Sequence, residues 1–563
     1  MKTQKQGRNG RKTGVEVVCL DCGAVEAYDA KASGCAACGS QWVEARYDYA
    51  EIGKIWGHEL EDRPFDLWRY GELLPIQDRQ AVLGMGEGGT PLIPAVNLGM
   101  MLGCPNIYIK DERQGPTSSF KDRQAAVGVA GLKEAGITEA VLASTGNVAI
   151  AYSAYAARAG IKLWAFLTSL VPAEKMREVA IYGTQVIKVT ASYDKAKQVA
   201  AAFAQERGLY LERGARSILP VEAMKTVAFE IAEQVGGLGA AHRAWRAPDW
   251  YVQAVSGGLG PYGVQKGFSE LMKMGLIERM PALASIQTEG CSPMVHAWKQ
   301  GLESAQPILS PRTHIATLST GDPGRMYTLL KQRMQAGGGG VFENVTDEEA
   351  FRAMHILAKM EGISVEPAAA VAFAGLIKLV RAGVIKSDQV IVVNCTGHTM
   401  PIEKSILGEG WARNVVIPGK SKVETPQEGL LAALRRVTAD RYPRILIVDD
   451  TPDARRLIRR VLQSQGEYTI YEASNGQDAL QIAQDEVPDL IILDLMMPEV
   501  DGFKVLDQLK ASPDTSPIPV IVVTAKELTA SEKRRLEGQI HTLMQKGEFM
   551  NDDLMDEVRS LVK

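Results

Sequence analysis

The sequence lacks an apolar run long enough to span a membrane, and it lacks an excess of charge of either sign. A membrane-spanning helix needs about 18 or more apolar residues, and no run in this chain is that long. The net charge of -4 gives no general reason to expect binding to nucleic acid or to an anionic membrane. The basic residues 1–12 are followed by no apolar segment of a secretory signal. We therefore expect a cytoplasmic protein.

The sequence also lacks internal repeats and strong compositional bias. Of its 563 residues, 46% are hydrophobic and 23% are charged, as in ordinary globular proteins rather than disordered or fibrous ones. A chain of this length predicts roughly three or four domains.

Cysteine is scarce, but four of the seven cysteines are crowded into one short segment. They form two C-x2-C pairs, Cys19 with Cys22 and Cys35 with Cys38. Glycines border both pairs, so two tight turns can present four thiolates to one zinc ion. Two disulfides are the alternative, which the absence of an export signal disfavours. We predict a structural zinc ribbon over residues 14–46. The remaining cysteines, which we expect to be buried apolar residues, are Cys104, Cys291 and Cys395.

Strand-like and helix-like stretches alternate over most of the remaining chain. The β-branched runs 140–144 and 161–167, for example, flank the helical pattern 148–160. Such alternation predicts a parallel sheet with helices on both faces, and a region of this length predicts two lobes with a cleft. The predicted divisions are a disordered tail (1–13), the ribbon (14–46), a large α/β region (47–417), a polar linker (418–440) and a second α/β domain (441–563).

Two loops match the pattern G-x-G-x-x-G, which can hold a phosphate. The loop 84–89 is followed by no helical pattern, so we interpret its match as chance. The loop 258–263 stands between the strand-like run 250–256 and a helix-like run, where backbone N–H groups would hold a phosphate. A dinucleotide site with Glu289 as the ribose ligand is one open interpretation. A tight strand-to-helix turn is the other.

Three further loops between strands and helices carry groups suited to chemistry. Lys121 stands beside Phe120 in a Ser-rich turn before a helical pattern, which lowers the pKa of its amine and favours a neutral nucleophile. Residues 144–147, Ser-Thr-Gly-Asn, form an anion site suited to a carboxylate. Thr396 and Gly397 follow another strand. Each group could be structural alone, but strand-end loops of open α/β sheets converge on one crevice.

Taken in order, these motifs make residues 14–417 resemble the threonine synthase family of fold-type II pyridoxal phosphate enzymes. The ribbon also resembles that of some members. The resemblance implies a two-lobed α/β fold and a pyridoxal 5'-phosphate cofactor. The matching motifs are Gly86–Leu92, Pro116–Arg123, Ser144–Asn147, Glu222 with Lys225-Thr226, Ser256–Leu259, Glu366-Pro367 and Thr396–His398.

The resemblance implies a role for each of these segments. Lys121 would bind the cofactor covalently and move protons, Asn147 would hydrogen-bond its 3′ oxygen, and Thr396 would face the pyridine nitrogen. A hydroxyl at that nitrogen suits elimination and replacement better than transamination. Ser256, Gly257, Gly258 and Leu259 would hold the cofactor phosphate, and Ser144, Thr145 and Gly146 the substrate carboxylate.

The implied reaction is that of a lyase acting on O-phospho-L-homoserine. Phosphate leaves by γ-elimination, and water then adds at the β-carbon to give L-threonine. The sequence departs from the family pattern where the substrate phosphate should bind. Residues 192–195 read Ser-Tyr-Asp-Lys in place of Asn-Phe-Asp-Asp, and Gln198 stands where an arginine is expected, with Lys195 or Lys197 as replacements. A threonine or serine dehydratase, or another β-replacement enzyme, therefore stays an alternative.

The lysine motif departs from the family pattern at two further positions. Residues 115–121 read Gly-Pro-Thr-Ser-Ser-Phe-Lys where the family has Asn-Pro-Thr-Gly-Ser-Phe-Lys.

The last domain gathers carboxylates, a hydroxyl and a lysine at the ends of strand-like runs. Acids at adjacent ends of parallel strands repel one another unless Mg²⁺ binds, and a hydroxyl and a lysine can stabilise a phosphoryl group on an aspartate. Residues 441–563 resemble a response-regulator receiver domain, which has a doubly wound, flavodoxin-like fold. The residues concerned are Asp449, Asp450, Asp494, Thr524 and Lys546.

By this resemblance Asp494 accepts the phosphoryl group, and the three aspartates bind Mg²⁺. Thr524 and Lys546 would contact the phosphoryl oxygens. Gly547 stands where the family has proline, and Leu543 stands at the aromatic switch position. The phosphorylation site therefore matches the family, while the usual conformational readout does not.

Two functional interpretations follow. In the first, an enzyme of amino-acid synthesis is controlled by a histidine kinase or another phosphodonor. In the second, the cofactor domain is a non-catalytic amino-acid sensor and the receiver does the signalling. The presence of Lys121, Asn147 and Thr396 favours the first. We expect pyridoxal phosphate, structural zinc and Mg²⁺ as cofactors, an amino-acid substrate, no nucleic-acid or membrane partner, and a homodimer by analogy.

Overall fold

The computed structural model describes residues 14–398 and 443–562, apart from gaps at 31, 33, 61, 169–170, 190–192, 239–244, 466–467, 498–500, 527 and 547–551. The predicted tail (1–13) and linker (418–440) lie outside the described residues, as does the predicted boundary at 417. The chain divides into two compact units. The first holds residues 1–95, 106–354 and 364–399, and the second holds 96–105, 355–363 and 400–563.

The first unit begins with a three-stranded antiparallel sheet that carries the clustered cysteines. A tight turn closes within each cysteine pair: the Gly23 N–H donates to Cys19 O at 3.1 Å, and the Gly39 N–H donates to Cys35 O at 2.9 Å. Positive φ angles at these glycines let the chain reverse there. The sheet order is β2-β1-β3, with β1 (Glu16–Cys19), β2 (Val25–Ala27) and β3 (Val43–Arg46).

A six-stranded sheet forms the core of what we call the large lobe of the first unit. Its order is β12-β11-β10-β13-β5-β4, and all neighbours are parallel except β4 and β5. The central strands β10 and β13 are buried along their whole length, as near-continuous apolar runs predict. The strands are β4 (Leu92–Pro94), β5 (Ile107–Asp111), β10 (Trp250–Ala254), β11 (Ala282–Thr288), β12 (Gly340–Val345) and β13 (Ile391–Cys395).

Helices cover this sheet. α13 packs on the three central strands β10, β11 and β13, while α9 packs on α7, α8 and α11. The helices that accompany the large lobe are α1 (Tyr49–Glu59), α7 (Ile218–Met224), α8 (Thr226–Gly236), α9 (Leu259–Lys273), α10 (Pro293–Lys299), α11 (Met326–Ala336), α12 (Asp347–Ile356) and α13 (Pro367–Arg381).

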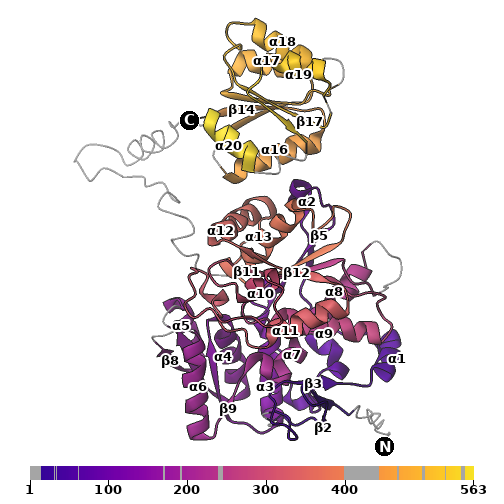
Figure 1. Ribbon diagram of the computed structural model, residues 1–563, viewed down its shortest axis with the longest axis vertical. Helices are drawn as coiled ribbons and strands as arrows, with labels where there is room; N and C mark the ends of the chain where they lie inside the picture. Colours follow the sequence, from indigo (N-terminus) through magenta and orange to yellow (C-terminus); the bar gives the residue numbers. More distant parts are fainter. Residues whose placement is uncertain are drawn as a thin grey trace, which may run out of the picture. The chain divides into compact units, whose positions relative to one another are not determined.

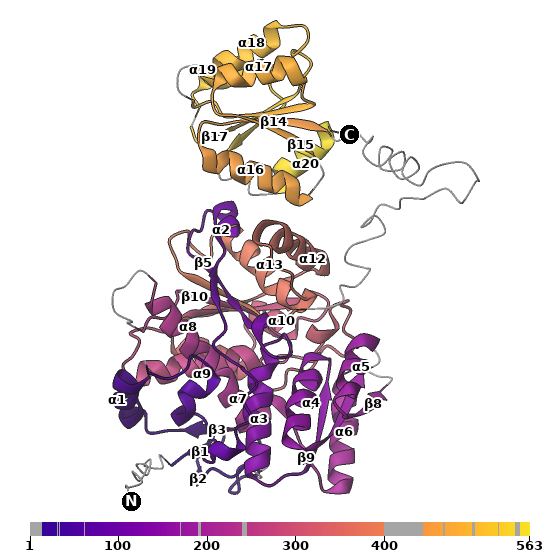
Figure 2. The ribbon, with the colours of Figure 1, turned by 180° about the vertical axis from the view of Figure 1, so that it is seen from behind.

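A four-stranded parallel sheet, in the order β8-β7-β6-β9, forms the small lobe. α6 packs on β6 and β7, and α3 packs on α4. Both views show these helices beside the sheet (Figure 1, Figure 2). The two lobes confirm the predicted two-lobed α/β fold. The elements are α3 (Lys121–Glu134), β6 (Glu139–Ser144), α4 (Asn147–Ala159), β7 (Lys162–Thr168), α5 (Ala173–Ile181), β8 (Gln185–Val189), α6 (Tyr193–Arg207) and β9 (Tyr210–Leu211).

The second unit contains a five-stranded parallel sheet in the order β15-β14-β16-β17-β18. Figure 1 shows α16 and α20 on one side of this sheet and α17, α18 and α19 on the other, as a doubly wound fold requires. Its elements are α2 (Val96–Leu102), β14 (Arg444–Val448), α16 (Pro452–Gln465), β15 (Thr469–Ala473), α17 (Gly476–Glu486), β16 (Leu490–Leu493), α18 (Gly502–Ala511), β17 (Val520–Thr524), α19 (Ala530–Leu536), β18 (Thr542–Gln545) and α20 (Asp552–Leu561). Among the described residues, no helix has the length and apolar character to cross a membrane.

Candidate active site, ribbon and phosphorylation site

Lys121 is the first residue of α3, and Phe120 ties it to the large lobe. The Phe120 N–H donates to Thr396 O at 3.0 Å, and the Lys121 Nζ lies 4.2 Å from the centre of the Phe120 ring. Removal of water by the surrounding protein lowers the pKa of Lys121 to about 8, although the charge of Glu366 acts in the opposite direction. The amine is therefore readily neutral and nucleophilic, as the sequence predicted.

In the turn before Lys121, the backbone is left-handed at Ser118, the position where the family pattern has glycine. Ser118 has a φ of 58°, a conformation that costs roughly 1–2 kcal/mol for a residue with a Cβ. Its carbonyl accepts the His398 N–H at 3.0 Å, and its own N–H donates to Gly115 O at 2.9 Å. The serine thus holds the turn beside the loop after β13.

Asn147 and Glu366 join the two lobes. The Asn147 Nδ2 donates to the Glu366 carboxylate at 2.8 and 3.0 Å. Glu366 stands just before Pro367 at the start of α13 and is 3% exposed. A Cβ on Gly397 would lie 2.8 Å from the Glu366 Oε1, so a side chain there would displace the Glu366 carboxylate. Asn147, Glu366 and the Thr396–Gly397 loop therefore belong to one site.

The loop after β6 is shaped by Ser144. The Ser144 Oγ accepts the backbone N–H groups of Gly146 at 3.0 Å and Ala149 at 3.1 Å. Gly146 has a φ of 137°, which a residue with a side chain rarely adopts. The start of α4 is therefore a candidate anion site, while the Ser144 side chain itself is buried.

The start of α9 is the second candidate anion site. Gly258 precedes the helix with a φ of 89°, and a Cβ on Gly260 would meet Gln253 at 2.3 Å and Phe120 at 3.1 Å. Phe120 therefore connects Lys121 to this helix start. The Ser256 Oγ lies 2.6 Å from the Thr320 Oγ1, so two hydroxyls meet at the place where the sequence predicted a phosphate.

Side chains without an assigned role in the sequence analysis also reach this site. They are Glu366, Thr320 and Lys175 of α5, whose Nζ donates to the Asn147 Oδ1 at 2.8 Å. Only Glu366 lay in a motif that the sequence singled out. Lys195 and Lys197 of α6 were predicted to replace the family's arginine. In the structure Lys195 donates to Gln198 at 3.3 Å and Lys197 lies 2.5 Å from Asp194, both on the same helix.

Residues 83–397 match the family described as pyridoxal-phosphate dependent enzymes, and residues 445–559 match the response regulator receiver domain. The chain is 36% identical to the threonine synthase of Methanocaldococcus jannaschii over 384 residues, which are 68% of this chain and 91% of that protein. The first unit carries a pyridoxal-phosphate dependent enzyme. This chain belongs to that family, with a receiver domain at its C-terminal end.

A second relative agrees with this membership, and a solved structure shows the same fold. The threonine synthase of Methanosarcina acetivorans is 33% identical over 392 residues, covering 69% of this chain and 93% of that protein. Diaminopropionate ammonia lyase from Escherichia coli has the same fold, with a TM-score of 0.50 and 17% identity over 59% of this chain and 90% of that one. The protein is thus a threonine synthase-like, pyridoxal phosphate-dependent lyase fused to a receiver domain.

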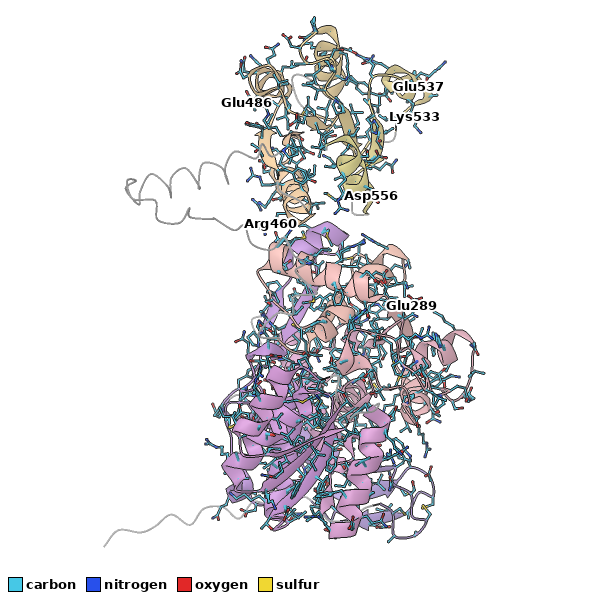
Figure 3. All side chains as sticks on the ribbon, turned by 90° about the vertical axis from the view of Figure 1, so that its left-hand side faces the viewer. Glu289, Arg460, Glu486, Lys533, Glu537 and Asp556 are labelled. Atoms are coloured by element: carbon cyan, nitrogen blue, oxygen red, sulfur yellow. The ribbon has the colours of Figure 1, made fainter. Side chains whose placement is uncertain are left out.

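The family match favours the pyridoxal phosphate interpretation of the 258–263 loop over the dinucleotide one. Glu289, the candidate ribose ligand of that alternative, lies exposed after β11 (Figure 3). The loop 84–89 is followed by β4 and not by a helix, as interpreted from its sequence. The residues present fit pyridoxal phosphate, because a lysine of lowered pKa, an amide, a hydroxyl and a glycine-lined helix start meet in one site.

The ribbon cysteines form a set of four sulfur atoms that fits a metal ion. All four Sγ atoms lie within 4.8 Å of one another, and none of the cysteines forms a disulfide. The Cys19–Cys38 and Cys22–Cys35 sulfurs are 3.6 and 3.7 Å apart, close to the edge of a tetrahedron with metal–sulfur bonds of about 2.3 Å. The two-disulfide alternative is therefore disfavoured and the zinc ribbon supported.

The ribbon is anchored to α9 by buried charges. The Lys266 Nζ donates to Ala45 O at 2.9 Å and lies 2.7 Å from both Glu222 and Glu270. The Tyr47 hydroxyl donates to Glu222 at 2.7 Å. The segment that follows the cysteines thus completes a polar cluster on α9, the helix whose N-terminal end is the candidate site for the cofactor phosphate.

We expect removal of the ribbon metal by a chelator to lower the melting temperature of the enzyme by several degrees. The ribbon has no apolar core of its own, and its unfolding would expose the charges of Lys266, Glu222 and Glu270. Thermal unfolding followed by circular dichroism, with released zinc measured by a colorimetric dye, checks this result. A Cys19→Ser/Cys22→Ser variant is the control: it should melt low and respond no further to chelator. An unchanged melting temperature after full zinc release would contradict the prediction.

The receiver site is assembled at the carboxyl ends of neighbouring strands β14, β16 and β17. One carboxylate oxygen from each of Asp449, Asp450 and Asp494 lies within 4.8 Å of the others, and oxygen donors of this kind fit Mg²⁺. The Lys546 Nζ lies 2.5 Å from Asp494 and 2.7 Å from Asp449. Burial would lower the pKa of Lys546, but its bonds to both aspartates outweigh burial and raise it.

Thr524 completes this group, since it ends β17 and its carbonyl accepts the Lys546 N–H at 2.8 Å. All five predicted receiver residues therefore lie at one edge of the sheet. Leu543 lies in β18 with an exposed fraction of 37%, while Gly547 lies outside the described residues.

Proposed function

We propose that the enzyme converts O-phospho-L-homoserine and water into L-threonine and phosphate. The observation that supports this most is the meeting of Lys121, Asn147, Thr396 and the start of α9 in a chain so similar to threonine synthases. When bound, pyridoxal phosphate supplies an electron sink that stabilises negative charge on the carbons of the amino-acid substrate. The chain's own residues hold the groups in place and move the protons.

Lys121 would hold the cofactor and then move protons between the substrate carbons. Its pKa of about 8 leaves an appreciable fraction of neutral amine near neutrality. Thr396 would offer a hydroxyl rather than a carboxylate to the ring nitrogen. Asn147, held by Glu366, would bind the ring oxygen.

The two helix starts would hold the anionic groups. Residues Ser256, Gly257, Gly258 and Leu259 precede and begin α9 and would bind the cofactor phosphate through backbone N–H groups. The loop of Ser144, Thr145 and Gly146 would bind the substrate carboxylate at the start of α4, with Ser144 shaping the loop. Both sites use helix ends and not a basic surface.

A comparison of substrates tests the proposal. The purified holoenzyme should release phosphate from O-phospho-L-homoserine and form L-threonine, while releasing little keto acid from L-threonine or L-serine. Phosphate is measured by a coupled assay and keto acid by reduction with a dehydrogenase. Keto-acid release without phosphate release would establish the dehydratase alternative. The absence of both activities in a holoenzyme that binds amino acids would favour the sensor interpretation.

We propose that Asp494 of the receiver is phosphorylated, with Asp449 and Asp450 binding Mg²⁺ and Thr524 and Lys546 contacting the phosphoryl oxygens. The Lys546 Nζ contact to Asp494 supports this assignment. A histidine kinase or a small phosphodonor would supply the group, and the linked enzyme would respond.

Asp494→Asn is expected to abolish labelling by a small phosphodonor such as acetyl phosphate in the presence of Mg²⁺. An amide cannot form the acyl phosphate, whereas the wild-type protein should gain one phosphoryl mass. Intact mass spectrometry checks the result. Asp501→Asn is the matched control, because Asp501 only caps α18 through the Lys504 N–H at 2.8 Å. Labelling of the Asp494→Asn protein at the wild-type level would rule out Asp494. Turnover with and without phosphodonor then measures the coupling to catalysis.

A further inference from the structure

Residues 256–259, which we call the phosphate loop, lie against helix α11. A Cβ on Gly258 would lie 3.2 Å from the Leu330 Cδ1 and 3.3 Å from the Met326 Cβ. Met326 and Leu330 stand one turn apart on α11, and both are buried. No side chain fits between the loop and the helix, so the position of the loop depends on the position of α11.

The ribbon contacts the beginning of α11. Arg325, which precedes this helix, pairs with Asp21 of the first cysteine turn. The other oxygen of the Asp21 carboxylate accepts the Ser40 hydroxyl at 2.5 Å, and Ser40 follows the second cysteine turn. Asp21 thus joins both turns to the start of α11. Four thiolates on one metal ion would hold the two turns together and keep these contacts in place.

A second contact between the ribbon and α11 lies about two turns further along the helix. Arg333 pairs with Glu44 of β3, the strand that follows the second cysteine turn. The Arg333 Nη2 also donates to the Tyr262 hydroxyl at 3.2 Å, and its guanidinium carbon lies 4.5 Å from the centre of the Tyr262 ring. The Tyr262 N–H donates to Gly258 O at 3.2 Å. Arg333 therefore links the ribbon, α11 and the first turn of α9.

The Arg333 pair is the stronger of the two contacts. The side chains of Arg333 and Glu44 are 20% and 17% exposed, so the loss of one partner leaves the other charge poorly solvated. The side chains of Arg325 and Asp21 are 29% and 42% exposed, and a pair that water screens in this way contributes less. The ribbon therefore acts on α11 mainly through Arg333.

We propose that the ribbon positions the phosphate loop through α11, with Arg333 as the positioning residue, so that the affinity for pyridoxal phosphate depends on the ribbon metal. This inference rests on the proposed function, in which residues 256–259 hold the cofactor phosphate. Arg333 acts through Tyr262 and α11, which fix the backbone N–H groups at the start of α9 where the phosphate would bind. The ribbon thus serves the loading of the cofactor as well as the stability of the fold.

Arg333→Gln in the full-length protein, loaded with zinc and stripped of cofactor, tests the proposal. Its dissociation constant for pyridoxal phosphate should rise roughly 10-fold, as for the loss of one charge-assisted hydrogen bond. The dissociation constant for pyridoxal, which has the aldehyde that reacts with Lys121 but no phosphate, should be unchanged. Arg333→Lys keeps the charge and should retain most of the affinity. Titration of the visible cofactor band measures each constant.

Lys331→Gln is the matched control on the same helix. The Lys331 Nζ contacts Glu303 at 2.8 Å and Leu302 O at 3.0 Å, so its loss perturbs α11 on a different side. Both dissociation constants of this variant should equal those of the wild type. Removal of the zinc by a chelator, below the melting transition, should weaken pyridoxal phosphate binding in the wild type and add little in Arg333→Gln.

Two results would overturn the inference. The first is a wild-type dissociation constant for pyridoxal phosphate in Arg333→Gln. The second is an equal loss of pyridoxal and pyridoxal phosphate binding, which would mean a general loosening of the site. Failure of the proposed function gives a different result, because a wild-type protein that binds pyridoxal as tightly as pyridoxal phosphate does not use residues 256–259 to hold a phosphate.

Discussion

Lys121→Ala is expected to lower turnover by about 1,000-fold or more and to remove the covalently held cofactor. Lys121 is the lysine at the start of α3, beside Phe120 and close to the Thr396 loop. Borohydride reduction followed by mass spectrometry measures the fixed cofactor, and the visible band measures the bound one. Lys133→Ala, at the exposed far end of α3, is the control and should behave as wild type.

The pKa of Lys121 gives this prediction a pH dependence. Because the neutral amine is the nucleophile, reattachment of pyridoxal phosphate to the stripped enzyme should accelerate as the pH rises through about 8. The rate should level off above that value, when nearly all of the amine is neutral. Stopped-flow absorbance follows the reaction. A rate that keeps rising beyond pH 10 would mean that the amine titrates like an ordinary lysine, and it would contradict the assigned environment.

Glu230→Ala is expected to destabilise the first unit by about 3–5 kcal/mol. The Glu230 carboxylate is fully buried and lies 2.7 Å from the Lys110 Nζ and 2.6 Å from the Arg123 Nη1. It also accepts the Gly89 and Thr90 N–H groups at 2.9 and 3.2 Å. The alanine variant would leave two buried cations and the backbone N–H groups of Gly89 and Thr90 without this partner, which is why the penalty is so large.

Urea unfolding followed by tryptophan fluorescence measures this loss. Glu206→Ala, an exposed position on α6, is the control and should change the free energy of unfolding by less than about 0.5 kcal/mol. Arg123 lies one half-turn after Lys121 on α3, so the Glu230→Ala protein should also hold the cofactor less tightly. A stability equal to that of the control variant would show that the buried cluster adds nothing.

The same carboxylate predicts how acid acts on the protein. Burial would raise the pKa of Glu230, but the charges of Arg123 and Lys110 outweigh burial and lower it below the ordinary value of 4.5. A carboxylate with a lowered pKa contributes stability above its unfolded pKa and loses it as the pH falls toward its folded pKa. The stability difference between the wild type and Glu230→Gln should therefore be constant near neutrality and shrink in strong acid.

Much of this architecture was predictable because its signals are local. The spacing of Cys19, Cys22, Cys35 and Cys38 predicted a four-sulfur cluster, and the structure brings those sulfurs together. Apolar runs that end in Asp449, Asp494 and Thr524 predicted acids at one edge of a parallel sheet, because all strands of such a sheet end on the same side. Ser144–Asn147 and Ser256–Leu259 were found by the same rule. Each of these patterns needs only a few neighbouring residues.

The parts that escaped prediction depend on distant residues. Lys175 approaches Asn147 from the next helix, and Glu366 reaches the same amide from 219 positions away in the sequence. Glu366 lay in a motif to which the sequence assigned no role, and Lys175 belongs to no pattern that distinguishes it from a surface charge. The sequence instead pointed to Lys195 and Lys197, which pair with their own helix.

The sequence by itself determined the ribbon, the two-lobed fold, the position of Lys121 and the aspartates of the receiver, because turn chemistry, strand patterning and ligand spacing act over short stretches. Only the tertiary structure decided that Glu366 holds Asn147, that Thr320 meets Ser256, that Glu230 pairs with both Arg123 and Lys110, and that Lys175 lies beside Asn147. These pairings bring together charged and polar groups that are costly to bury alone. Their partners are set by how the lobes and helices pack, and packing joins segments that are far apart in the chain.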